Sequence, residues 1–175
     1  MQPYSATEER MLALLQGWKQ AQDRRYLFLE CYVMMTRNML AALEKGEFHD
    51  PAWMARLLHR FAEYYFTALE YYEVDSPLTP PVWALAHRQA GLPETLVLQN
   101  LFLGINAHIN YDLVLTTVEL LTEEWAGLSE EQRRERHADF CQVNAIIAAT
   151  MDAVQDEVVE KAEPEIGRAS CRERV

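Results

Sequence analysis

The chain has 175 residues, of which 50% are apolar and 25% charged, and its formal net charge is −11 at pH 7. This length allows one domain with a hydrophobic core, and the composition is that of a soluble globular protein. Because an acidic surface repels phosphate groups and anionic lipids, we expect no nucleic-acid partner and no membrane binding.

Three further features indicate a cytoplasmic location. The N-terminal stretch MQPYSATEER lacks the basic and apolar segments of a secretory signal. The least polar long stretch, residues 95–118, contains too many polar side chains for a membrane span. Cys31 and Cys141 stand in apolar surroundings without a CxxC motif, which is typical of a reducing compartment.

Helical patterns follow one another along the chain, and no segment predicts a strand. A capping box, Ser5-Ala-Thr-Glu8, opens the first expected helix, and Gly46 ends the second. Asp50-Pro51 is an N-cap followed by proline at the first helical position, and Ser129-Glu-Glu-Gln132 is a second capping box. The expected helices cover residues 5–22, 24–45, 51–72, 79–90, 93–125 and 129–162.

The gaps between these helices are short, so neighbouring helices should pack antiparallel. We therefore predict an all-α fold, a single-domain antiparallel bundle of about six helices over residues 1–164. The ending EIGRASCRERV, residues 165–175, differs in composition from the rest and is what a common sequencing-adapter read encodes. We expect these residues to be a library artefact that follows a protein cut near Pro164. Re-sequencing the source gene tests this expectation.

The segment GINAHINYDL carries four polar side chains within a helix that is apolar nearly all round. Such a helix is normally central in a bundle. His108 and Asp112 lie one turn apart on one stripe of it, within reach of each other. Asn106 and Asn110 form a second pair at the same spacing, well round the helix from the first.

Buried polar groups need partners, and the last helix offers some. Its Asn144, Asp152 and Gln155 project from one broad face. We therefore expect a polar seam between the two long C-terminal helices, with Asn106 and Asn110 turned toward other helices.

Two interpretations of this seam remain open. In the first it is a functional site for a small ligand or a divalent metal, where His108 is a metal ligand or general base beside Asp112 and Asp152. The expected catalytic residues are then His108, Asp112 and Asp152, the expected metal ligands are His108 and Asp112, and the expected ligand-binding residues are Asn106, Asn110, Asn144 and Gln155. In the second, the protein is a non-enzymatic interaction protein whose polar seam specifies packing. The sequence contains no ExxH, GxSxG, HExxH or glycine-rich phosphate motif that would indicate a particular reaction. A hydrolase is nevertheless compatible with the first interpretation.

The segment LGINAHINYDL, preceded by PPVWALAHRQAG and followed by DFCQVNAIIAATMDAVQDEV, resembles a bacterial all-helical family, domain of unknown function 5995. The resemblance covers roughly residues 61–164 and is carried by the motifs N-A-H-I-N-x-D and V-N-x-I-x(5)-D-x-V-Q-D. It implies an all-helical fold, points to the same two helices, and implies no particular activity.

Overall fold

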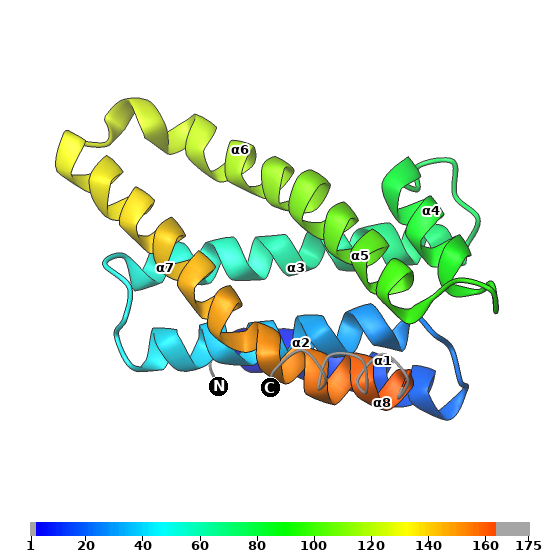
Figure 1. Cartoon of the computed structure of the whole chain (residues 1–175). Coiled ribbons are helices and arrows are strands. Elements are labelled where there is room, and N and C mark those ends of the chain that lie inside the picture. Colours follow the sequence, from blue (N-terminus) through cyan, green and yellow to red (C-terminus); the bar gives the residue numbers. More distant parts are fainter. Residues whose placement is uncertain (1–2, 164–175) are drawn as a thin grey trace.

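The computed structural model describes residues 3–163, with side chains from Ala6 onward, so the suspected artefact at 165–175 lies outside the described residues. Every regular element in the described part is helical, which confirms the predicted all-α, single-domain bundle (Figure 1). Two π-helical turns, His108–Asp112 and Gln155–Val159, join α5 to α6 and α7 to α8, so residues 3–163 form six continuous helical segments. The helices are α1 Pro3–Gln20, α2 Tyr26–Glu44, α3 Pro51–Glu73, α4 Pro81–Ala90, α5 Val97–Ala107, α6 Leu113–Glu124, α7 Glu130–Val154 and α8 Glu160–Ala162.

The caps predicted for three helix ends are present. The Asp50 side chain accepts from the Trp53 amide at 2.9 Å and begins α3. Ser129 and Gln132 form the reciprocal capping box that begins α7. Gly46, at φ +71, follows α2 in the left-handed conformation that glycine adopts without strain.

Two predicted helix starts are wrong. Helix α1 begins at Pro3, so Ser5 lies inside it and does not cap it. Helix α5 begins at Val97 and not at Pro93, because the chain first makes a turn in which the Thr95 amide donates to the Leu92 carbonyl at 3.1 Å.

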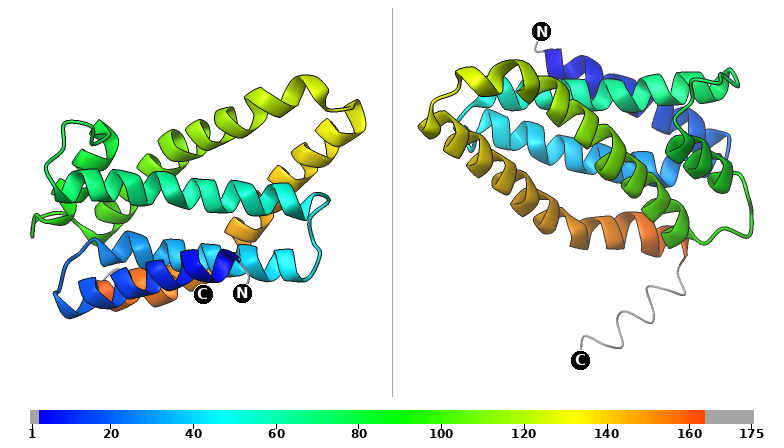
Figure 2. Two further views of the ribbon diagram at one scale, coloured as in Figure 1. Left: turned by 180° about the vertical axis from the view of Figure 1, so that it is seen from behind. Right: turned by 90° about the horizontal axis from the view of Figure 1, so that it is seen from above.

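The α6–α7 hairpin packs with one helix on each member of the α2–α3 pair. Helix α6 packs against α3, whereas α7 packs against α2, and the hairpin tip extends beyond the rest of the bundle (Figures 1 and 2). Helix α4 closes the opposite end by packing against α3 and α5. No helix within residues 3–163 combines the length and apolar character that a membrane-spanning segment needs.

Gly104 allows α5 to pack closely on α2. A Cβ atom at this position would lie 2.5–2.8 Å from three side-chain atoms of Phe28. Gly104→Ala should therefore destabilise the protein by about 1–3 kcal/mol, even though alanine favours helix by about 1 kcal/mol. Gly17→Ala is the matched control, because a Cβ there meets nothing within 4 Å, and it should stabilise by about 0.4–1 kcal/mol. Urea denaturation measures both effects; equal stabilisation by the two substitutions would contradict the close contact.

Candidate functional site

The π-helical turn directs the polar side chains of GINAHINYDL. The Leu113 amide donates to the His108 carbonyl, five residues back, so this turn holds one more residue than an α-helical turn. In a regular α-helix, residues four apart drift about 40° round the axis. The wider turn counters this drift, and His108, Asp112 and Thr116 all face inward, with exposures of 4%, 0% and 0%.

Asp112 accepts hydrogen bonds from two buried side chains. Trp83 Nε1 lies 3.0 Å from each carboxyl oxygen, and His108 Nδ1 lies 2.9 Å from Oδ2. Because an ionised carboxyl group can only accept, the imidazole donates from Nδ1 and keeps a lone pair on Nε2. Burial lowers the pKa of His108, against the opposing effect of Asp112, so the ring is neutral at neutral pH.

The His108 ring lies within a cluster of aromatic side chains. Phe61 stacks on it with ring centroids 3.6 Å apart and planes 8° apart, and Tyr32 meets it edge-on at 4.2 Å. The other rings around it are Phe28, Tyr65 and Trp83. This packing fixes the orientation of the imidazole and removes it from water.

An apolar cavity of about 410 Å³ lies beside this ring, between α2, α3, the π-helical turn and α7. His108 lines the cavity and Asp112 does not. Nε2 is buried and has no hydrogen-bond partner among the described residues. The exposed lining residues Ile109, Asn144 and Met151 mark the opening. The apolar lining includes Phe28, Met35, Met39, Leu57, Phe61, Ile105, Leu113, Val143 and Ile147.

The expected polar seam between the two long C-terminal helices is not formed. Asn106 and Asn110 are exposed and bond to each other at 2.8 Å. On α7, Asn144 and Asp152 are exposed, and Gln155 is half-buried at the start of the second π-helical turn. The faces of α6 and α7 that meet the core carry apolar residues such as Leu121 and Val143, which leaves these polar side chains outside.

His108 and Asp112 are therefore the two predicted site residues that the fold brings together in its interior. The third residue of this hydrogen-bonded group, Trp83, comes from α4 and was not predicted for this site. A signal existed in the sequence, because a buried tryptophan N–H usually finds an acceptor. The sequence did not show, however, that α4 would cover this side of the π-helical turn.

The side chains around His108 limit the chemistry of the site. Within residues 3–163, no group of three His, Cys, Asp or Glu side chains is placed to hold a metal ion. Cys31 also lines the cavity, but burial raises the pKa of its thiol to about 12, so the nucleophilic thiolate is not populated. No serine, threonine or cysteine of the described chain bonds to Nε2, as an activated nucleophile would.

These features define an all-helical protein in which a buried, neutral histidine, bonded to an aspartate, lines an apolar cavity. The chain belongs to the family of unknown function DUF5995, whose sequence model matches residues 5–170. The relationship thus extends through the N-terminal helices, beyond the segment in which the sequence motifs lie. Comparisons with curated proteins and with solved structures found no match.

Proposed function

We propose that the cavity binds a small, largely apolar organic molecule whose N–H or O–H group donates a hydrogen bond to His108 Nε2. The observation that carries this proposal is the buried Nε2 atom without a partner on a cavity-lining side chain. The volume of about 410 Å³ falls within the range of about 300–1,000 Å³ of small-molecule pockets, and the lining is predominantly apolar.

In this proposal each polar residue has a distinct role. His108 contacts the ligand, Asp112 holds the tautomer that leaves Nε2 unprotonated, and Trp83 orients Asp112. Asn144 meets any polar group at the cavity opening. A ligand that donates to Nε2 satisfies an acceptor that is otherwise unpaired, whereas a hydrocarbon of the same shape leaves it unpaired. The binding protein would act in the cytoplasm without nucleic acid or membrane.

Indole and indene test this preference, because the two bicyclic molecules have nearly the same shape and indole has an N–H donor. Calorimetric titration should give about tenfold tighter binding of indole, the effect of one net hydrogen bond. His108→Asn is the informative variant, since the asparagine amide replaces Nδ1 as the donor to Asp112 and has no counterpart of Nε2. It should bind indole and indene equally.

Ile147→Trp is the control that locates the binding site, because the larger side chain fills the cavity and should abolish binding of both probes. Because the pKa of His108 is lowered from 6.5, indole affinity should stay constant between about pH 8 and 6.5 and fall only in more acidic solution. Equal binding of indole and indene by the unmodified protein would contradict the role of Nε2. If neither probe binds and His108→Asn is strongly destabilised, the pair is a packing device, as the alternative interpretation holds.

General-base catalysis is a second candidate, favoured by the hydrogen bond between His108 and Asp112. Nε2 would take a proton from a bound substrate or water, and Asp112 would stabilise the imidazolium that forms. Elemental analysis of protein purified without chelator tests the remaining metal hypothesis. Near-stoichiometric metal that is lost in folded His108→Asn would replace the organic-ligand proposal with a metal site.

A further inference from the structure

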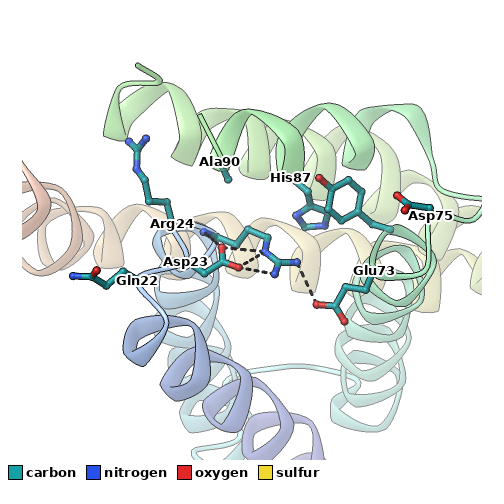
Figure 3. Close-up of a pocket in the computed structure, with 10 residues that line it drawn as sticks. Gln22, Asp23, Arg24, Glu73, Asp75, His87 and Ala90 are labelled. Atoms are coloured by element: carbon teal, nitrogen blue, oxygen red, sulfur yellow. Dashed lines mark hydrogen bonds and ion pairs between the residues drawn. The ribbon is translucent and has the colours of Figure 1, made fainter. Parts of the chain in front are cut away.

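A second, polar cavity of about 620 Å³ lies where the α1–α2 turn meets the ends of α3 and α4 (Figure 3). It is separate from the apolar cavity and is called the polar cleft below. Charged and polar side chains line most of it, including Asp23, Arg24, Arg25, Glu73, Asp75 and His87.

Three helices end at the polar cleft. Helix α1 ends at Gln20, just before the lining residue Gln22; α3 ends at the lining residue Glu73; and α4 ends at the lining residue Ala90. Helix C-termini carry partial negative charge and favour cations. The one N-terminus nearby, that of α2, is already satisfied, because the amides of Tyr26 and Leu27 donate to the carbonyls of Asp23 and Arg24, each at 3.1 Å.

The two arginines of the polar cleft are engaged with protein acceptors. Arg25 bonds to Asp23 through Nε and Nη2 and to Glu73 through Nη1, with an ion-pair distance of 2.6 Å to Asp23. Arg24 donates to the carbonyls of Leu92 and Thr95. Two arginines thus stand against three carboxyl groups, a balance of −1 when His87 is neutral. The side chain of Asp75 is exposed and has no partner among the described residues.

His87 supplies an independent sign of a ligand. The residue is 6% exposed, and its Nε2 atom is buried without a hydrogen-bond partner in the described chain. Burial lowers the pKa of His87 to about 3, so the ring is neutral and one of its nitrogens offers a lone pair. Trp83 and Tyr72 hold the ring from two sides, at centroid distances of 5.2 and 4.9 Å.

The backbone of the polar cleft is strained at two places. Gln22 and Asp75 have φ values of 56° and 50°, and they are the residues other than glycine with positive φ in the described chain. Both line the polar cleft, and in Figure 3 they stand on opposite sides of Asp23 and Glu73. Such strain persists where surrounding structure imposes it and concentrates at ligand sites.

We propose that the polar cleft binds a small organic cation, a primary ammonium or guanidinium group, between Asp75 and His87. Two groups of the polar cleft have no partner among the described residues, the carboxyl of Asp75 and the Nε2 atom of His87. The carbonyls in the last turns of the three helices mostly accept backbone amides and contribute through the helix dipole. An anion would find the guanidinium groups occupied and the net charge unfavourable. A donor-rich cation satisfies the buried acceptor and the exposed carboxyl together.

An NMR titration with n-butylammonium, using butyrate as the anion of matched size, tests this proposal. Butylammonium should produce saturable shifts in the amides of Gln22 and Asp75 and in the His87 ring nitrogens, and butyrate should produce none. Asp75→Asn changes an exposed residue and should weaken binding about tenfold. Glu123→Gln on α6 removes the same charge from an exposed site without a partner in the described chain and should leave the affinity unchanged.

His87→Phe keeps an aromatic ring against Trp83, removes the ring nitrogens and should weaken butylammonium binding at least as much as Asp75→Asn. If His87→Phe does not fold, the Asp75→Asn and Glu123→Gln pair still decides the question. Saturable binding of butyrate, absence of saturable butylammonium shifts, or equal weakening by Asp75→Asn and Glu123→Gln would each overturn the proposal. The last result would mean general attraction to an acidic surface. Indole binding in the apolar cavity does not depend on any of these outcomes.

Discussion

Asp112→Ala should destabilise the protein by about 3–5 kcal/mol, because it removes the acceptor of two buried donors at once. Trp83 Nε1 and His108 Nδ1 both depend on this carboxyl group, and Asp112 itself is 0% exposed. Neither donor has an alternative acceptor among the described contacts. The loss should appear as a lower midpoint of urea unfolding followed by circular dichroism, with an unchanged slope if the denatured state is unaffected.

Asp112→Asn separates the charge from the shape of this acceptor. The amide oxygen can still accept from Trp83, so the loss should be smaller, about 1–2 kcal/mol. Its NH₂ group then faces His108 Nδ1, which must become the acceptor, and the ring proton moves to Nε2. Under our proposal Asp112→Asn should bind indole no better than indene while retaining the fold. A retained preference for indole would show that Asp112 does not set the tautomer.

Asp139→Ala is expected to cost about 2–4 kcal/mol, although the residue is remote from the cavity. The Asp139 carboxyl group is fully buried and accepts from the backbone amides of His49 and Asp50, at 2.7 and 2.9 Å. These bonds tie the α2–α3 connection to α7. Alanine leaves both amides buried without a partner, and chemical denaturation measures the cost.

Asp152→Ala on the same helix is the control for this substitution. Asp152 is exposed, so its replacement should change stability by no more than about 0.5 kcal/mol. A similar loss of stability in both variants would mean that acidic residues stabilise α7 generally, and that the two amide contacts of Asp139 carry no special weight.

The bundle could be predicted because the residues that begin and end its helices act locally. The Asp50 cap, the Ser129 capping box and Gly46 act within a few residues, so sequence spacing is enough to recognise them. The capping box at Ser5 failed because the helix continues upstream to Pro3. Pro93 failed as a helix start because the tight turn from Leu92 to Thr95 takes the chain as far as Leu96 before α5 begins.

The pairing of His108 with Asp112 could be predicted from the sequence, whereas the side chains that surround the pair could not. His108 and Asp112 are neighbours within one turn, so a local rule finds them. Their aromatic cage and Trp83 come from other helices, and their placement depends on how the helices cross. Asp139 gave no signal, because it stands in the charged run EEQRRERHADF and its partners are backbone amides about 90 residues away.

The π-helical turn has a consequence for how this site varies within the family. Because the turn contains one residue beyond an ordinary helical turn, deleting a single codon between positions 108 and 112 would convert the segment to uninterrupted α-helix. Helices α5 and α6 would keep their directions and their packing on α2 and α3, and His108 and Asp112 would stand three residues apart instead of four. A relative one residue shorter here would therefore share the bundle and carry an α-helical i,i+3 spacing in place of this i,i+4 pair.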